Sequence, residues 1–209
     1  MVDSAATSPA HTSMDEVPDL EQGGTNVDRT FEHTGRNLLR AIALYLDLDE
    51  HYFDDKIKNG NSILRLLHYY PVQNLDDIED GAVRAAAHGD INLITLLMGG
   101  SAKGLQAKNS DGAWVDVSPG ADEIVINIGD MLHRHTNGRL KSTIHRVINL
   151  DKASMRFPRY SAPFFLHPRS DMDLSCLEGC VNAANPKGYD DITAGEFLDE
   201  RIRELGLKK

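Results

Sequence analysis

The sequence predicts a mainly β fold, a double-sheet jelly roll or barrel with α-helices flanking it. The first observation is a series of about eight short strand-like segments between residues 61 and 168, separated by turn signals. The second is a helical pattern of apolar residues on either side of this series. Closely spaced short strands are typical of jelly rolls and barrels, and the helices at each end are expected to cover the outside of one sheet.

Residues 1–27 are predicted to form a disordered tail, because they contain too few large apolar side chains to offset the entropy of ordering. Residues 28–209 are predicted to form one domain. Within it, 28–60 are helical, 61–168 form the jelly-roll core, and 169–209 are irregular apart from a terminal helix. The first helix is expected over 28–48, where Phe31, Leu38 and Ile42 recur at spacings near three and four. The terminal helix, over 193–205, opens with the capping-box residues Thr193 and Glu196.

The strands are expected to lie between breaks made by proline, glycine and asparagine. One strand ends at Pro71, and residues 85–90 and 91–98 are expected to pair. A hairpin is predicted around the turn residues 109–112. The segments expected to be extended are 62–70, 85–90, 91–98, 104–107, 113–117, 123–128, 140–149 and 155–167, with a single helical turn over 131–136.

The chain has 209 residues and a formal net charge of −10, which argues against a nucleic-acid partner or an anionic membrane surface. No apolar run approaches the roughly 20 residues that span a bilayer. A cytoplasmic location is the default expectation. Cys176 and Cys180 are read as free thiols of a reducing compartment, with a local disulfide as the alternative.

Three residues are candidate metal ligands. His88 and Asp90 stand two apart, so on a strand both side chains project to the same side. His145 is a third candidate, on a later strand. Two histidines and one carboxylate, with the remaining coordination positions open, form the facial triad of non-haem iron(II) sites. The alternative is a surface loop in which a His-x-Asp sequence occurs by chance.

Arg159 and Ser161 are candidates for binding a carboxylate. They also stand two apart and share one face of a strand. A guanidinium offers a rigid fork that matches a carboxylate in two parallel hydrogen bonds, and a neighbouring hydroxyl can supply another. The alternative is an arginine on the protein surface. Arg156 is a competitor for this role, but no x-Ser follows it.

These stretches together resemble one family. His88-Gly89-Asp90 is followed by Gly104-Leu105-Gln106, Gly129-Asp130-Met131-Leu132, His145-Arg146-Val147 and Arg159-Tyr160-Ser161-Ala162-Pro163 in a single order. The run is similar to the 2-oxoglutarate- and iron(II)-dependent oxygenases, in particular their isopenicillin N synthase-like branch. The resemblance extends from about Leu64 to Leu166.

The resemblance implies a double-stranded β-helix and a full set of site residues. His88, Asp90 and His145 would bind iron(II), and Arg159 with Ser161 would hold the distal carboxylate of 2-oxoglutarate. Tyr70 would contact the same carboxylate, because the segment from His68 to Pro71 resembles the Asn-Tyr-Tyr-Pro stretch of the family. The implied reaction uses O2, hydroxylates or desaturates an unidentified small molecule, and releases succinate and carbon dioxide.

The sequence also departs from the family. The separation between His145 and Arg159 is longer than usual, and His68 replaces the family asparagine. His133 and His135 are expected to be structural or exposed. Family members carry a further segment before the first helix. Without it we expect an exposed sheet edge and an apolar patch, and a chain that is marginally stable alone, aggregates, or self-associates through that edge.

Three other functions remain open. One is a truncated, non-catalytic jelly-roll relative. Another is an isopenicillin N synthase-like oxidase that does not use 2-oxoglutarate. The third is a cupin-like isomerase or hydrolase that uses another divalent metal.

Overall fold

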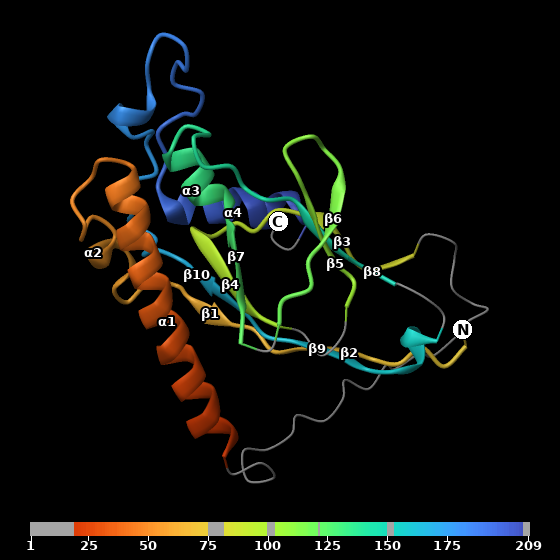
Figure 1. Cartoon of the computed structure of the whole chain (residues 1–209). Helices are drawn as coiled ribbons and strands as arrows, with labels where there is room; N and C mark the ends of the chain where they lie inside the picture. The colour runs from red at the N-terminus through yellow and green to blue at the C-terminus, as the bar shows by residue number, and fades with distance from the viewer. Residues whose placement is uncertain (1–18, 75–81, 100–102, 121, 150–152, 207–209) are drawn as a thin grey trace, which may run out of the picture.

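The computed structural model describes residues 19–74, 82–99, 103–120, 122–149 and 153–206, and its centre is a set of antiparallel sheets (Figure 1). The first sheet has the order β1 (Ile63–Leu64), β10 (Pro163–Leu166), β4 (Ile94–Met98) and β7 (Ile124–Ile128). The second has the order β3 (Val83–His88), β8 (His145–Ile148), β5 (Leu105–Lys108) and β6 (Trp114–Asp116). A two-stranded sheet pairs β2 (Leu67–Tyr69) with β9 (Arg159–Ser161). The predicted jelly-roll fold is confirmed.

Helix α1 (Leu20–Tyr45) covers the outer face of the first sheet (Figure 1). The ring of Phe31 stacks on that of Phe164 in β10, with centroids 5.6 Å apart. Gly35 lies where the helix touches Leu166 and Leu96, so a side chain there would crowd both leucines. The short α2 (Asp54–Ile57) follows and is tied to α1 by an ion pair between Arg40 and Asp54. The predicted cover over one sheet is therefore confirmed for the first helix.

The start of α1 corrects the predicted tail. The tail was expected to reach residue 27, but the helix begins at Leu20 and includes Gly23 and Gly24. Two contacts between residues four apart support this first part, an amide hydrogen bond from Gln22 to Asn26 and one from the Thr30 hydroxyl to the Asn26 carbonyl. The rest of the predicted tail, residues 1–18, lies outside the described residues.

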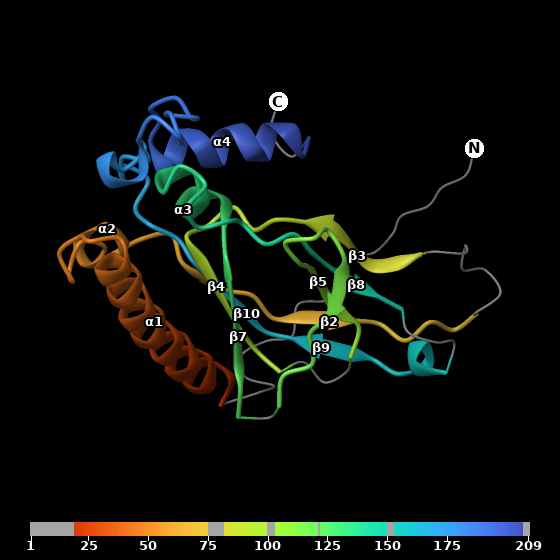
Figure 2. The ribbon, with the colours of Figure 1, turned by 45° about the horizontal axis from the view of Figure 1, so that its top comes forward.

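Two further helices close one end of the sheets (Figure 2). Helix α3 (Asp130–His135) follows β7, and α4 (Ala194–Glu204) packs on it where Arg134 lies over the ring of Phe197. The turn after α3 needs a left-handed residue, and Asn137 supplies it with φ 49°. Its side chain also bonds the backbone of the irregular segment before α4, which contains the 3-10 turn η4 (Glu178–Cys180).

Two strand predictions are wrong. The segments 85–90 and 91–98 do not pair, because β3 and β4 belong to different sheets. Residues 62–70 and 155–167 are each divided as well, the first into β1 and β2 and the second into the 3-10 turn η3 (Ser154–Arg156), β9 and β10. Strands that pass from one sheet to another must bend, and the ladder is interrupted at the bend.

The core lies between α1 and the first sheet, with Leu39, Phe53, Leu96 and Phe164 fully buried. Among the described helices, none is both long enough and apolar enough to cross a membrane.

Candidate metal centre

His88 and His145 are direct neighbours across two strands. They face each other in the register of β3 and β8, and their ring centroids are 4.4 Å apart. Asp90 follows β3, and its Oδ1 lies 4.0 Å from Nε2 of His88 and 3.8 Å from Nε2 of His145. All three donor atoms lie within 4.8 Å of one another. The structure thus brings the three predicted ligands together at one point.

Backbone carbonyls fix the tautomer of both histidines. Nδ1 of His88 lies 2.7 Å from the carbonyl oxygen of Ala86, and Nδ1 of His145 lies 3.0 Å from that of Thr143. A carbonyl oxygen can only accept a hydrogen bond, so each Nδ1 carries a proton, and in the neutral ring the lone pair is then on Nε2. Both lone pairs belong to the nitrogen atoms nearest Asp90. Neutral imidazoles in this tautomer are the form that binds a metal ion.

The carboxylate of Asp90 is held in the same way. The residue is only 6% exposed, and its Oδ2 accepts hydrogen bonds from the Thr95 hydroxyl at 2.6 Å and the Asn127 amide at 2.8 Å. Thr95 and Asn127 are themselves paired neighbours in β4 and β7. These two bonds occupy one oxygen and leave Oδ1, the atom nearest both histidines, for a metal.

The chain crosses between the sheets at Asp90 and is fixed there by close backbone packing. The carbonyl of Asp90 accepts a hydrogen bond of 2.7 Å from the Asp130 amide at the start of α3. Gly129 lies so close to Asn92 that a Cβ atom would stand 2.2 Å from its carbonyl oxygen. Only glycine fits at this contact, so Gly129 sets how closely β7 approaches the segment that carries Asp90.

The three candidate ligands line a cavity of about 550 Å³ between the two sheets. Arg159, Ser161 and Tyr69 line the same cavity. Arg159 is 5% exposed and lies over the ring of Tyr69, and its Nε has no hydrogen-bond partner among the described residues. Burial lowers the pKa of this guanidinium, which the nearby Tyr69 partly offsets. A buried donor without a partner is costly and marks a place where a ligand acceptor fits.

Tyr70 does not lie beside Arg159, which corrects the sequence prediction. Its side chain is 69% exposed and contacts His68 on the outer face of β2. Tyr69 faces inward instead, because β2 and β9 pair Tyr69 with Arg159. The alternation of the strand already placed Tyr69 opposite to Tyr70. Only the pairing with β9 decides which of the two faces is inside.

The other histidines named from the sequence have structural roles. His135 is buried, and its ring nitrogens contact the Tyr52 hydroxyl and the Ser175 carbonyl. His133 contacts the Leu140 carbonyl and the Tyr189 hydroxyl. This confirms the expectation for both. His68 stacks on the ring of Tyr160 in the neighbouring strand.

The structure also places the two cysteines and Arg156, and it adds residues that the sequence did not single out. Cys176 and Cys180 are free thiols, as expected. Arg156 is exposed and lies outside the cavity, so it does not compete with Arg159. Sequence reasoning missed Thr95, Asn127 and Arg65, all of which line the cavity. The sequence signal of Thr95 and Asn127 is a polar residue at an inward position of an otherwise apolar strand.

Comparisons with known proteins agree with this geometry. The family model described as the 2OG-Fe(II) oxygenase superfamily matches residues 60–168. The chain is 37% identical over 164 residues to the 2-oxoglutarate-Fe(II) type oxidoreductase hxnY of Emericella nidulans, which covers 78% of this chain and 46% of that protein. It is 36% identical to the 2-oxoglutarate-dependent dioxygenase citB of Monascus ruber over 78% of this chain and 49% of that protein.

Solved structures are similar over nearly the whole chain. A 2OG-Fe(II) oxygenase family protein from Caulobacter crescentus superposes with a TM-score of 0.83 and 42% identity, over 96% of this chain and 64% of that one. Neurospora crassa T7H in complex with alpha-KG gives a TM-score of 0.84 and 32% identity, over 97% of this chain and 63% of that one. The chain spans about half the length of the curated relatives it matches.

Proposed function

Because the chain belongs to the 2OG-Fe(II) oxygenase superfamily, we propose that it is an iron(II)- and 2-oxoglutarate-dependent dioxygenase of a small molecule. It hydroxylates or desaturates that molecule and releases succinate and carbon dioxide. One observation carries the proposal. The donor atoms of His88, Asp90 and His145 converge in the same cavity as a buried arginine whose Nε has no partner.

The metal would be held by Nε2 of His88, Nε2 of His145 and Oδ1 of Asp90. Two neutral imidazoles and one carboxylate suit iron(II) and leave positions open for 2-oxoglutarate and O2. Bound iron(II) and 2-oxoglutarate would supply the activation of O2, and the protein supplies position and surroundings. Thr95 and Asn127 keep the carboxylate from turning away, and the two backbone carbonyls keep both imidazoles in the ligand tautomer.

Arg159 and Ser161 would hold the distal carboxylate of 2-oxoglutarate. The two residues are successive inward positions of β9, and both line the cavity. The partnerless Nε of Arg159 fits an acceptor, and a carboxylate can take two parallel bonds from the guanidinium. Tyr69 takes the place first given to Tyr70 as the aromatic neighbour of this group. A site of this kind argues against a cupin-like isomerase or hydrolase, in which Arg159 would have no carboxylate to bind.

The remaining wall of the cavity is mostly apolar and includes Leu97, Leu105, Val125 and Val147. Against these apolar walls the few polar side chains of the cavity, among them the metal ligands and Arg159, would orient a ligand. The free thiols Cys176 and Cys180 support a reducing compartment, and we propose a cytoplasmic location on that basis.

Anaerobic titration tests the assignment of ligand and co-substrate. Iron(II) should bind to the purified chain, and 2-oxoglutarate should add a visible absorption band to the complex. Replacing Arg159 by lysine should lower the affinity for 2-oxoglutarate by about 10- to 100-fold, because the lysine keeps the charge but cannot make two parallel hydrogen bonds. The affinity for iron should stay nearly unchanged. Arg156→Lys, at an exposed arginine outside the cavity, is the matched control and should alter neither affinity.

Equal loss of iron and 2-oxoglutarate affinity in Arg159→Lys would contradict the role given to Arg159. Succinate release across a panel of metabolites, with and without O2, then tests turnover. Iron and 2-oxoglutarate binding without any succinate release would favour the non-catalytic relative.

A further inference from the structure

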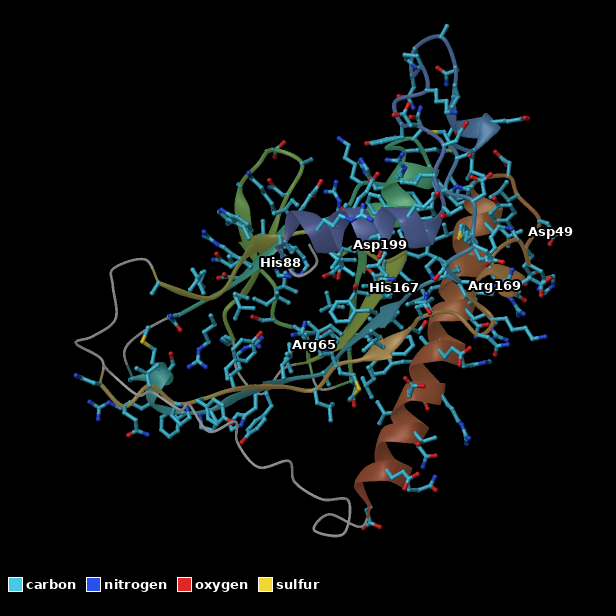
Figure 3. The ribbon with its side chains drawn as sticks, turned by 180° about the vertical axis from the view of Figure 1, so that it is seen from behind. Asp49, Arg65, His88, His167, Arg169 and Asp199 are labelled. Atoms are coloured by element: carbon cyan, nitrogen blue, oxygen red, sulfur yellow. The ribbon has the colours of Figure 1, made fainter. Side chains whose placement is uncertain are left out.

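Arg65 is a second arginine in the cavity, and the proposed chemistry gives it no task. It lies on the segment between β1 and β2 and lines the cavity that also holds the metal ligands. Its backbone amide donates to the carbonyl of Pro163, but its guanidinium has no hydrogen-bond or ion-pair partner among the described residues. Figure 3 labels Arg65 and His88, which lie among the strands on two different segments of the chain.

Arg65 lies just before β2, two positions ahead of Leu67. Arg65, Leu67 and Tyr69 stand at alternate positions, and all three line the cavity; Leu67 and Tyr69 are half-buried, and Arg65 is exposed to solvent. Leu67 pairs with Ser161 and Tyr69 with Arg159, so Arg65 lies at the opposite end of the row from Arg159. Four residues of extended chain span roughly 13 Å. The two guanidiniums therefore serve separate groups.

The charges of the cavity also leave Arg65 without a counterpart. Among the described residues that line it, three carry a formal charge: Arg65, Asp90 and Arg159. Asp90 and Arg159 offset each other, and a dianionic 2-oxoglutarate offsets iron(II). Only the positive charge of Arg65 is then left over. A guanidinium matches a carboxylate in geometry as well as in charge.

The surroundings of Arg65 indicate what else the bound molecule contains. Pro163 pairs with Leu97, and Leu97 pairs with Val125, so these three form an apolar row beside Arg65. The next inward row, Phe165, Thr95 and Asn127, is the one that holds Asp90. A molecule between Arg65 and the metal ligands would lie against the apolar row.

We propose that the substrate of this enzyme is a small monocarboxylate with an apolar body, and that Arg65 binds its carboxylate. The inference rests on the proposed function and adds the class of substrate to it. Arg65 then determines which molecules enter the cavity, and the far end of the apolar body would lie beside the metal held by His88, Asp90 and His145.

Ligand-observed NMR of the full chain, loaded with Zn(II) and saturating 2-oxoglutarate, tests this without turnover. The probes are 3-phenylpropanoate and hexanoate, each compared with its primary amide, which has nearly the same shape and no charge. The acids should bind more tightly than the amides. Arg65→Met should lower the affinity for the acids by about 10- to 100-fold, the usual effect of losing hydrogen bonds to a charged group. The affinity for the amides should stay unchanged. Arg65→Lys should keep part of the preference.

Arg156→Met is the matched control and should change neither acid nor amide binding. Thermal unfolding of each variant establishes that it is folded. Three results would each overturn the proposal. The unchanged protein could bind acids and amides equally, it could bind neither acid, or Arg65→Met could lose equal affinity for acid and amide. The affinity for 2-oxoglutarate is measured on the same samples. If the unchanged protein does not bind 2-oxoglutarate, the proposed function is contradicted. The comparison of acids with amides, repeated without 2-oxoglutarate, would then decide the role of Arg65.

Discussion

Thr95 and Asn127 determine which oxygen of Asp90 is free, so they should control metal affinity without touching the metal. Replacing Asn127 by leucine keeps most of the side-chain volume but removes the donor to Oδ2. The carboxylate can then turn, and metal affinity should fall by about 10- to 100-fold, the usual cost of losing a hydrogen bond to a ligand. Titration with Mn(II) or Fe(II) measures this. Thr143→Val is the control, because Thr143 lines the cavity but does not bond Asp90 through its side chain. Unchanged affinity in Asn127→Leu would show that Thr95 alone positions the carboxylate.

His167 should make the stability of the fold depend on pH. It follows β10 (Figure 3), and burial lowers its pKa from 6.5 to about 4, with nearby Asp90 opposing the shift. Between these two values the unfolded chain binds a proton that the folded protein excludes, so stability is complete above pH 6.5 and falls as the pH drops toward 4. The loss attributable to this one residue is on the order of 3 kcal/mol.

Urea unfolding at several pH values measures this dependence. His167→Leu should reduce the slope of stability against pH in that window, and His33→Gln, at an exposed histidine on α1, should leave it unchanged. A slope in His167→Leu equal to that of the unchanged protein would count against the assignment.

The residues of the site differ in how well the sequence predicted them. The convergence of the three candidate ligands was predicted because His88 and Asp90 stand at the spacing of one strand face, and because several motifs occur in one order. Tyr70 was misplaced because strand alternation gives two faces but does not say which is inside. The pairing of Tyr69 with Arg159 decides this, and that contact joins residues far apart in the sequence. Arg65 was missed for the same reason.

At the scale of elements, α4 depends on its first turn. The Thr193 side chain accepts from the Glu196 amide at 3.3 Å, and the Glu196 carboxylate accepts from the Thr193 amide at 2.9 Å. Thr193→Ala should lower the free energy of unfolding by about 1 kcal/mol, and Thr193→Ser should restore most of it. Urea denaturation measures both changes. A loss in the serine variant as large as that in the alanine variant would show that packing of the threonine methyl group, rather than capping, matters here.

The elements predicted well are those whose pattern is local. The hairpin of β5 and β6 follows from its turn, where the Asn109 side chain accepts from the amides of Asp111 and Ala113. The pairing of β3 with β4 was wrong, because their short connection suggests a hairpin although it crosses between sheets. The early start of α1 also escaped prediction, since Leu20–Val27 has no apolar repeat and extends a helix that is anchored further along by Phe31 and Leu39.

At the scale of the molecule, exposed apolar side chains gather beside a sheet edge, as predicted. Strand β1 ends the order of the first sheet, and Ile63 and Leu66 are 55% and 64% exposed. Met98 and Tyr160 border a depression next to them. We expect two copies of the chain to associate through this edge. Sedimentation velocity over a range of concentrations measures the association.

The double variant Ile63→Lys, Leu66→Lys should remain monomeric at concentrations where the unchanged chain associates. Leu44→Lys, at a leucine of α1 that is 58% exposed, is the control and should behave like the unchanged chain. If the unchanged chain stays monomeric at every concentration, it does not associate through this edge.

The hydrogen bonds that fix His88, His145 and Asp90 within the protein itself have a consequence for the identity of the metal. The three donors are arranged before any ion arrives, so the site cannot reject an ion by requiring a costly rearrangement. Nitrogen and oxygen donors bind divalent ions with affinities that rise from manganese through iron, cobalt and nickel to copper, and zinc also binds more tightly than iron. Which ion would occupy the site therefore depends on the supply of metals where the chain folds, and purification in the presence of nickel or zinc should leave one of these ions in place of iron.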